Sequence, residues 1–192
     1  LPGSLSGFSG KVGIGHTRYS TAGVSDLANA QPVRGIFQGR EFFVGHNGNL
    51  INTKELIYEA GFKEGGLEEG CSDTRVIAAL VSQSPRPAFQ EAILDVLAKL
   101  KGAFNLIFIF DNNLYAVRDP FGFHPLQLGR RGQDFLVASE SCVFDQLGGT
   151  LVRDIRPGEM ITIDTDGSHS FFFTGRTALK IDIFEYIYFL RP

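Results

Sequence analysis

The apolar run Phe-Phe-Val at 42–44 is followed directly by the polar stretch Gly-His-Asn-Gly-Asn at 45–49. The Asn47 carboxamide and the Gly48 N–H could form an oxyanion hole, because a tetrahedral intermediate needs fixed donors where its negative charge develops. Glycine suits this position, since its backbone can adopt a positive φ and approach a ligand closely. Asn-Gly is also a favoured hairpin dipeptide, so the pair taken alone is more typical of a plain turn than of an oxyanion hole.

Two other segments carry residues that could bind a charged ligand. Arg18, in His-Thr-Arg-Tyr-Ser-Thr at 16–21, could hold a carboxylate through two charge-assisted hydrogen bonds, or could pair with an acid on the surface. Asp73, in Gly-Cys-Ser-Asp-Thr-Arg at 70–75, could receive an ammonium group. An acid in the first turn of a helix is also favoured by the helix dipole alone.

The three segments, in this order and at this spacing, resemble the glutamine-binding motifs of class II glutamine amidotransferases. Further motifs extend the resemblance over nearly the whole chain, to the glutaminase domains of the amidophosphoribosyltransferase family. They are Gly-Ala-Phe at 102–104, Arg-Asp-Pro-Phe-Gly at 118–122, Ala-Ser-Glu-Ser at 138–141, Asp-Ile-Arg-Pro-Gly-Glu at 154–159 and Phe-Glu-Tyr-Ile-Tyr-Phe at 184–189. The resemblance implies an α+β fold of the N-terminal-nucleophile hydrolase type, a layered sandwich of antiparallel sheets between helices.

The resemblance also implies a role for each candidate residue. Asn47 and Gly48 are expected to be the catalytic oxyanion donors. Arg18 and Thr21 are expected to bind the α-carboxylate of glutamine. Asp73 is expected to bind the α-ammonium group, so that the site would recognise an amino acid by both charged ends.

The nucleophile of this family is a cysteine at the mature N-terminus, and its own α-amine transfers the protons. This chain opens with Leu1 instead. We expect residues 1–176 to be a partial glutamine amidotransferase type 2 domain, lacking the opening strand and the nucleophile. Residues 177–192 are expected to lead to a missing phosphoribosyltransferase domain, and the fragment itself is expected to be inactive.

Four other side chains invite a catalytic interpretation. His16 and His46 could act as general bases, but each stands at an expected strand end, where a partly buried structural histidine is commoner. Cys71 is near a helix N-terminus, which can lower a thiol pKa, yet the family places this position behind the amino group of the substrate. Cys142 is expected to be a small core residue. None of the four is predicted to replace the terminal cysteine.

The expected parent enzyme hydrolyses glutamine and passes ammonia to 5-phosphoribosyl pyrophosphate, which yields 5-phosphoribosylamine in purine biosynthesis. One alternative is another class II amidotransferase, forming glucosamine 6-phosphate or asparagine. A second alternative is a non-catalytic glutamine-binding module.

Composition indicates a globular protein that acts on a small molecule. The 192 residues carry a net charge of −3, which gives no case for a nucleic-acid or membrane partner. Two cysteines favour a reducing cytoplasm. No metal site or cofactor is expected in this domain, and Asp182 stands where some relatives have a cysteine ligand of an iron–sulfur cluster. Magnesium is expected in the missing phosphoribosyltransferase domain, and the parent is expected to be a homo-oligomer.

Hydrophobic periodicity and turn residues predict the elements that must position these groups. The expected strands are 12–16, 42–45, 104–110, 114–118, 126–129, 135–138, 160–163 and 170–173. The expected helices are 53–60, 73–81, 88–100 and 139–147. Ser72 is the expected N-cap of the second helix.

Overall fold

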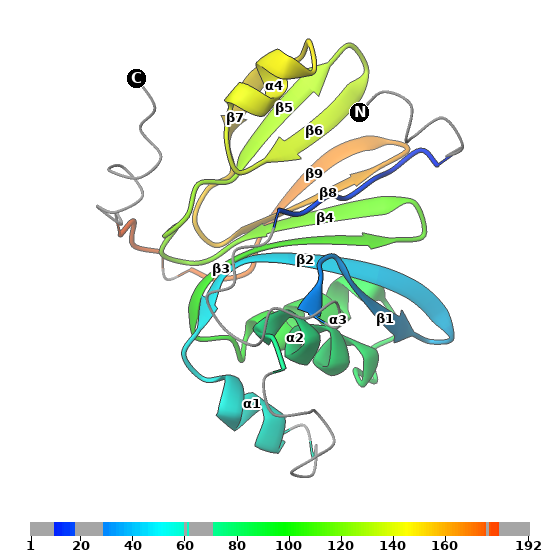
Figure 1. The fold of residues 1–192 in the computed structure, drawn as a ribbon, viewed down its shortest axis with the longest axis vertical. Coiled ribbons are helices and arrows are strands. Elements are labelled where there is room, and N and C mark those ends of the chain that lie inside the picture. The colour runs from blue at the N-terminus through cyan, green and yellow to red at the C-terminus, as the bar shows by residue number, and fades with distance from the viewer. Residues whose placement is uncertain (1–9, 18–28, 60, 62–70, 176, 181–192) are drawn as a thin grey trace.

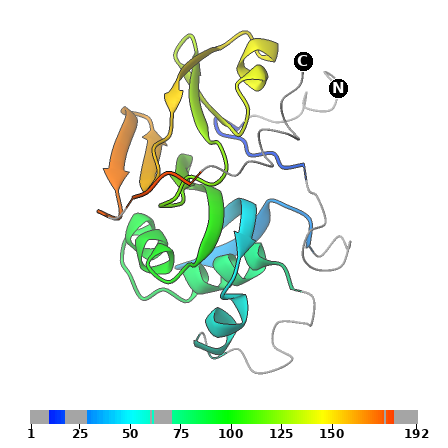
Figure 2. The same ribbon diagram turned by 90° about the vertical axis from the view of Figure 1, so that its left-hand side faces the viewer.

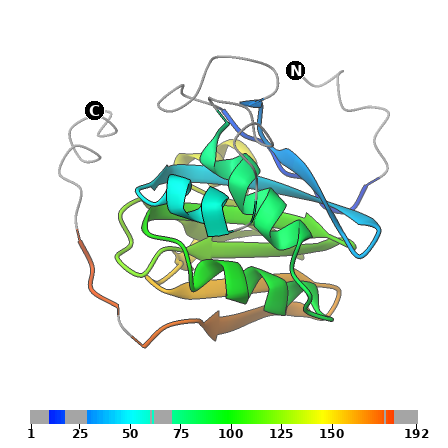
Figure 3. The same cartoon turned by 90° about the horizontal axis from the view of Figure 1, so that it is seen from below.

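Two antiparallel sheets pack face to face in this chain, with helices on their outer faces (Figures 1 and 2). The structure is a computed structural model that describes residues 10–17, 29–59, 61, 71–175 and 177–180. The larger sheet has the order β1-β2-β3-β4-β8-β9, and the smaller sheet has the order β6-β5-β7. Helices α1, α2 and α3 lie on the outer side of the larger sheet, as the view from below shows (Figure 3). The expected α+β sandwich is confirmed.

The bounds of the elements are as follows. The strands are β1 (Val33–Phe37), β2 (Arg40–Leu50), β3 (Gly102–Phe110), β4 (Asn113–Arg118), β5 (Gln127–Arg131), β6 (Asp134–Ala138), β7 (Thr150–Asp154), β8 (Glu159–Asp164) and β9 (Gly167–Phe172). The helices are α1 (Thr53–Glu59), α2 (Asp73–Ser82), α3 (Phe89–Leu97) and α4 (Cys142–Gln146).

The expected strand at 12–16 is wrong. Val12, Ile14 and His16 are half-buried and alternate with exposed residues, which is the pattern that suggested a strand. The segment crosses the face of β2, where a Cβ on Gly45 would lie 3.3 Å from Ile14 Cδ1. Because it lies over a face and not beside an edge, it is not paired as a strand among the described residues.

Two strands were missed, and one is longer than expected. β1 and β7 contain arginines and a mixed pattern, and β7 is largely exposed, so neither shows clean alternation. β2 continues through the polar stretch as far as Leu50, because β3 pairs with it residue by residue. Leu50 itself is buried, which anchors the far end of the strand.

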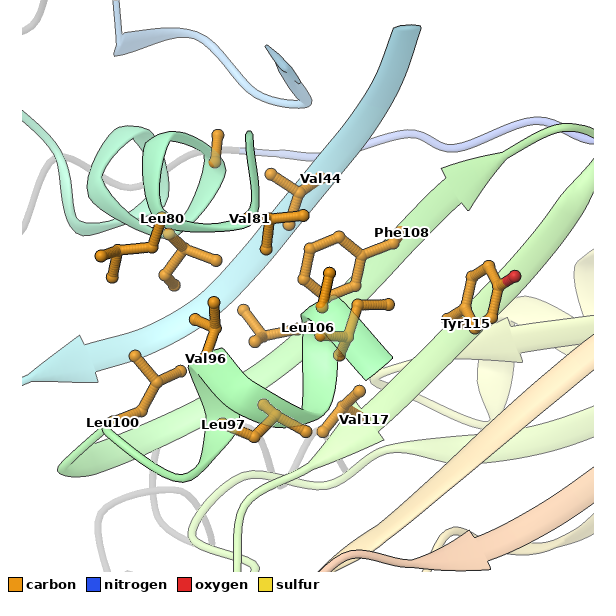
Figure 4. Packing of buried hydrophobic residues seen from close by; sticks show 14 of the residues in the cluster. Val44, Leu80, Val81, Val96, Leu97, Leu100, Leu106, Phe108, Tyr115 and Val117 are labelled. Atoms are coloured by element: carbon orange, nitrogen blue, oxygen red, sulfur yellow. The ribbon is translucent and has the colours of Figure 1, made fainter. Parts of the chain in front are cut away.

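The main core lies between α2, α3 and the larger sheet (Figure 4). The periodic stripe of α3 supplies Phe89, Ile93, Val96 and Leu97, all buried. Phe89 is the centre of an aromatic cluster. Its ring stacks on Phe110 at 4.3 Å between centroids and contacts four more rings at 5.2–6.1 Å, those of Phe37, Phe42, Phe108 and Tyr115. This cluster holds α3 against four strands.

The second core joins the two sheets. Ala116 and Ile161 of the larger sheet pack with Leu128 of β5 and with Leu126, which comes just before β5. An ion pair joins β7 of the smaller sheet to β8 of the larger sheet. The buried Glu159 carboxylate accepts two hydrogen bonds from the Arg153 guanidinium, at 2.7 and 2.9 Å. Burial would raise the pKa of Glu159, but these bonds and that from the Arg156 N–H outweigh it and hold the pKa below its usual range.

Across the described ranges, none of the helices is long and apolar enough to cross a membrane.

Replacing Phe89 with alanine is expected to lower the free energy of unfolding by about 3–5 kcal/mol, because it leaves a cavity at the centre of the aromatic cluster. Phe172→Ala is the matched control, since Phe172 is 47% exposed on β9; its cost should stay below about 1 kcal/mol. Urea unfolding of both variants is the measurement. Equal losses would show that α3 is not held by this cluster.

Candidate active site

The edge of β2 that faces away from β3 carries a row of backbone N–H groups. In an antiparallel ladder, alternate residues direct their N–H and C=O groups to opposite neighbours. Ile51 N–H binds Lys101 O at 2.9 Å, so the odd-numbered residues of β2 bond toward β3. The even-numbered residues therefore direct their N–H groups to the opposite edge.

The groups on either side of Gly48 confirm this alternation. The His46 N–H donates to Gln31 Oε1 at 2.6 Å, and the Leu50 N–H donates to Asp73 Oδ2 at 2.8 Å. β1 covers this edge only as far as Val44. Among the described residues no acceptor takes the Gly48 N–H, so it remains available to a ligand.

Asn47 and Gly48 lie within β2 and not in a turn, because β2 continues beyond the expected strand at 42–45. Asn47 is opposite Asn105, and Gly48 is opposite Phe104. The Asn47 side chain is exposed. Gly48 has φ +145°, and a Cβ there would lie 2.1 Å from the Ala103 carbonyl oxygen. Glycine is needed at this position because any side chain would push β2 away from β3.

Asp73 opens α2 and is fastened to the strand end. Its Oδ1 accepts a bond from Thr53 Oγ1 at 2.7 Å, and its Oδ2 accepts the Leu50 N–H. Ser72 occupies the N-cap position as expected, with extended backbone, but its hydroxyl makes no capping bond. Each carboxylate oxygen of Asp73 keeps lone-pair capacity for a further donor.

The Gly48 N–H and the Asp73 carboxylate therefore lie along one edge, two residues apart. Two residues of a strand span about 7 Å, which is comparable to an extended glutamine side chain. One end of this edge could hold a carboxamide oxygen, and the other end could hold an ammonium group. Thr53 bonds to Asp73 at one end of this edge, and Gln31 bonds to the His46 N–H at the other. Neither residue belongs to a recognisable motif in the sequence.

His46 is buried under this edge, and burial lowers its pKa to about 4. Its Nε2 lies 3.5 Å from the Ala103 carbonyl oxygen, and its own carbonyl accepts a bond from His16 Nε2 at 3.0 Å. A neutral, enclosed imidazole fits the structural role expected for His46. That neither histidine transfers protons in catalysis stays a prediction.

The remaining candidates divide into three groups. Arg18 and Thr21 lie outside the described residues. Cys71, whose Sγ donates to Ser72 O at 3.6 Å, is half-buried just before α2. Cys142 was expected in the core, and this is wrong. It is exposed at the start of α4, because Phe144 fills the space against Gly129 instead.

Within the part of the chain that the structure describes, no three His, Cys, Asp or Glu side chains are grouped closely enough to hold a metal ion.

Comparison with known proteins identifies the family. The family described as "Glutamine amidotransferase domain" matches residues 16–146, a span that contains β1 to β6, the β2 edge and Asp73. The chain belongs to the class II glutamine amidotransferase domain family. Its layered sandwich is the N-terminal-nucleophile hydrolase fold.

The relatives of this glutamine amidotransferase domain are longer proteins. An amidophosphoribosyltransferase from Mycobacterium leprae is 42% identical over 98% of this chain and 35% of its own length. The glutamine phosphoribosylpyrophosphate amidotransferase from B. subtilis, solved with ADP and GMP, is 34% identical with a TM-score of 0.83 over 92% of this chain and 38% of its own. A structure described as the allosteric regulatory enzyme of purine biosynthesis is 36% identical with a TM-score of 0.84, over the same shares. The chain spans between a third and two fifths of these proteins.

Substituting Gly48 by alanine is expected to lower the free energy of unfolding by about 3 kcal/mol, since it adds both an unfavourable φ and a clash with Ala103. Gly132→Ala is the matched control, with φ +59° but open space around the added methyl. Its cost should be about 1 kcal/mol. If thermal or urea unfolding gives the same loss for both, the close approach of β2 and β3 is not what requires glycine.

The His46 ring is expected to titrate with a pKa of about 4 in the folded chain, against 6.5 when unfolded. Between these values the unfolded chain binds more protons, so stability is fully present above pH 6.5 and is lost as pH falls toward 4. The slope from this group is at most about 1.4 kcal/mol per pH unit. NMR titration of the imidazole protons measures it, with the urea-unfolded chain as reference. A folded-state midpoint near 6.5 would contradict the burial.

Proposed function

We propose that the chain is the glutaminase part of an amidophosphoribosyltransferase. It would release ammonia from glutamine, and a phosphoribosyltransferase domain in the same polypeptide would transfer that ammonia to 5-phosphoribosyl pyrophosphate, forming 5-phosphoribosylamine. The observation that carries this proposal is the edge of β2, where the available Gly48 N–H and the Asp73 carboxylate are spaced for the two ends of glutamine. The names of the relatives support the choice of acceptor.

In this proposal each group has one task. The glutamine carboxamide oxygen lies between the Asn47 Nδ2–H and the Gly48 N–H, and the Asp73 carboxylate receives the α-ammonium. When a thiolate adds to the carboxamide carbon, its carbonyl oxygen becomes an oxyanion. The hydrogen bonds from the two donors then become stronger, because negative charge has moved onto the oxygen that they bind. Arg18 and Thr21 would hold the α-carboxylate.

The nucleophile in this proposal is the N-terminal cysteine that the family resemblance implies, supplied by the complete gene product upstream of Leu1. The sequence printed here contains two cysteines. Cys142 lies on α4 over the smaller sheet, and Cys71 precedes the helix that carries Asp73. Neither position is at the carboxamide end of the proposed site, so neither thiol is proposed as the nucleophile. We therefore propose that the isolated chain binds glutamine without hydrolysing it.

The partners and location follow from the same proposal. Magnesium would bind with the pyrophosphate substrate in the phosphoribosyltransferase domain, and the complete enzyme would be a homo-oligomer. We place it in the cytoplasm, because two cysteines in 192 residues do not make a disulfide framework. Residues 177–192 would lead into the second domain.

In the complete gene product, Asn47→Ala is expected to lower kcat for glutamine by about 10²–10³ with little change in KM, because an oxyanion donor acts mainly in the transition state. Arg18→Ala and Asp73→Asn should instead raise KM, since both groups bind the substrate before reaction. Ammonia and glutamate release with 5-phosphoribosyl pyrophosphate present is the measurement. Asn113→Ala, a half-buried amide at the distant start of β4, is the control.

Three outcomes would contradict the proposal. Effects of all three variants on KM alone would remove the oxyanion role of Asn47. Use of fructose 6-phosphate or aspartate as acceptor would keep the amidotransferase class but change the enzyme. Glutamine binding without turnover by the complete product would favour a non-catalytic module.

A further inference from the structure

Asn105 is a buried amide on β3, next to the candidate oxyanion donor Asn47 on the neighbouring strand β2. It lies directly opposite Asn47 in the β2–β3 register, in the middle of an otherwise apolar strand. Side chains of directly opposed residues stand on the same face of a sheet, with Cβ atoms about 5 Å apart. The two carboxamides are therefore neighbours on the face that looks toward the smaller sheet.

The nitrogen of the Asn105 amide is held by a hydrogen bond. Its Nδ2 donates to the Pro125 carbonyl at 2.8 Å. The connection that contains Pro125 is itself rigid, because the Arg118 guanidinium donates to the carbonyls of His124 at 2.9 Å and Gly122 at 3.1 Å. Asn105 is thus held in one orientation.

The oxygen of the same amide has no partner among the described residues. Asn105 is only 3% exposed, and its Oδ1 is buried without a hydrogen-bond donor among the described residues. A buried acceptor left unpaired costs free energy. Because Nδ2 is committed to Pro125, the amide cannot flip to relieve this, and Oδ1 must take a donor from its surroundings.

Asn47 has a donor to offer. A primary amide carries two N–H groups, and only one of them can point at an oxyanion. The exposed Asn47 carboxamide rotates freely unless the second N–H is held. Rotation about the side-chain torsions of Asn47 would bring that N–H to the acceptor directly across the ladder.

We propose that Asn105 is a positioning residue, whose Oδ1 accepts the second N–H of the Asn47 carboxamide and so aims the first N–H at the oxyanion. Pro125 O, Asn105 and Asn47 then form one chain of hydrogen bonds that ends at the reacting group. Preorganisation of this kind removes the need to reorient the donor while charge develops. The inference rests on the proposed function for its kinetic consequence, but not for the hydrogen bond itself.

The hydrogen bond is tested on the 192-residue chain by NMR of its ¹⁵N-labelled side-chain amides. One of the two Asn47 Nδ2 protons is expected to exchange slowly with water. Asn105→Leu removes the acceptor, whereas Asn105→Asp keeps an acceptor oxygen, and both lose the bond to Pro125. Slow exchange should persist in Asn105→Asp and disappear in Asn105→Leu. If leucine prevents folding, Asn105→Ala makes the same test.

The kinetic arm uses the complete gene product and a double-mutant cycle. Asn105→Leu is expected to lower kcat for glutamine by about 10- to 100-fold, with KM unchanged. In an Asn47→Ala background the same change should have little further effect, because its action passes through Asn47. Aspartate is left out of this arm, since a negative charge would oppose the oxyanion.

The outcomes separate the two proposals. Equal exchange of the Asn47 protons in all the Asn105 variants overturns the inference, as does an equal fall in kcat with and without Asn47. If the Asn47 proton loses its protection from exchange in Asn105→Leu but not in Asn105→Asp, the hydrogen bond is supported. If the complete gene product then does not hydrolyse glutamine, the proposed function is overturned instead.

Discussion

The pairing of β2 with β3 is the constraint on which the rest of the site depends. It runs without interruption from Phe42 opposite Phe110 to Leu50 opposite Gly102. Its alternation decides which N–H groups of β2 bond to β3 and which face the open edge. Its register decides that Asn47 stands beside Asn105. The close approach of β2 to β3 requires glycine at position 48, because a Cβ there would clash with the Ala103 carbonyl oxygen.

The polar groups of the site are supported by a core that resists their displacement. Phe42 and Phe108, on the two paired strands, pack through Phe89 against α3. Asp73 couples α2 to the end of β2, so the helix cannot shift without breaking the bond to Leu50. An ammonium placed at Asp73 would thus be held at a fixed distance from the Gly48 N–H, which is what recognition of a single side-chain length requires.

Local chemistry let the sequence predict the helices and most of the central strands. The family resemblance pointed to the candidate groups on β2 and α2, whose roles stay predictions. Stripes such as that of α3 depend only on neighbouring residues, and they were read correctly. The misses depend on distant partners. Val12, Ile14 and His16 alternate like a strand but cross a face, and β7 was missed because its residues are mostly exposed. Asn105 gave no motif signal, since its meaning comes from the residue opposite it in another strand.

The central claim is that the open edge of β2 reads both ends of glutamine. A crystal structure of the chain soaked with L-glutamine tests it most directly. The carboxamide oxygen is expected within hydrogen-bond distance, about 3 Å, of both the Gly48 nitrogen and Asn47 Nδ2, with the α-ammonium on the Asp73 carboxylate. Glutamine bound away from β2, or reversed so that its carboxamide meets Asp73, would contradict it.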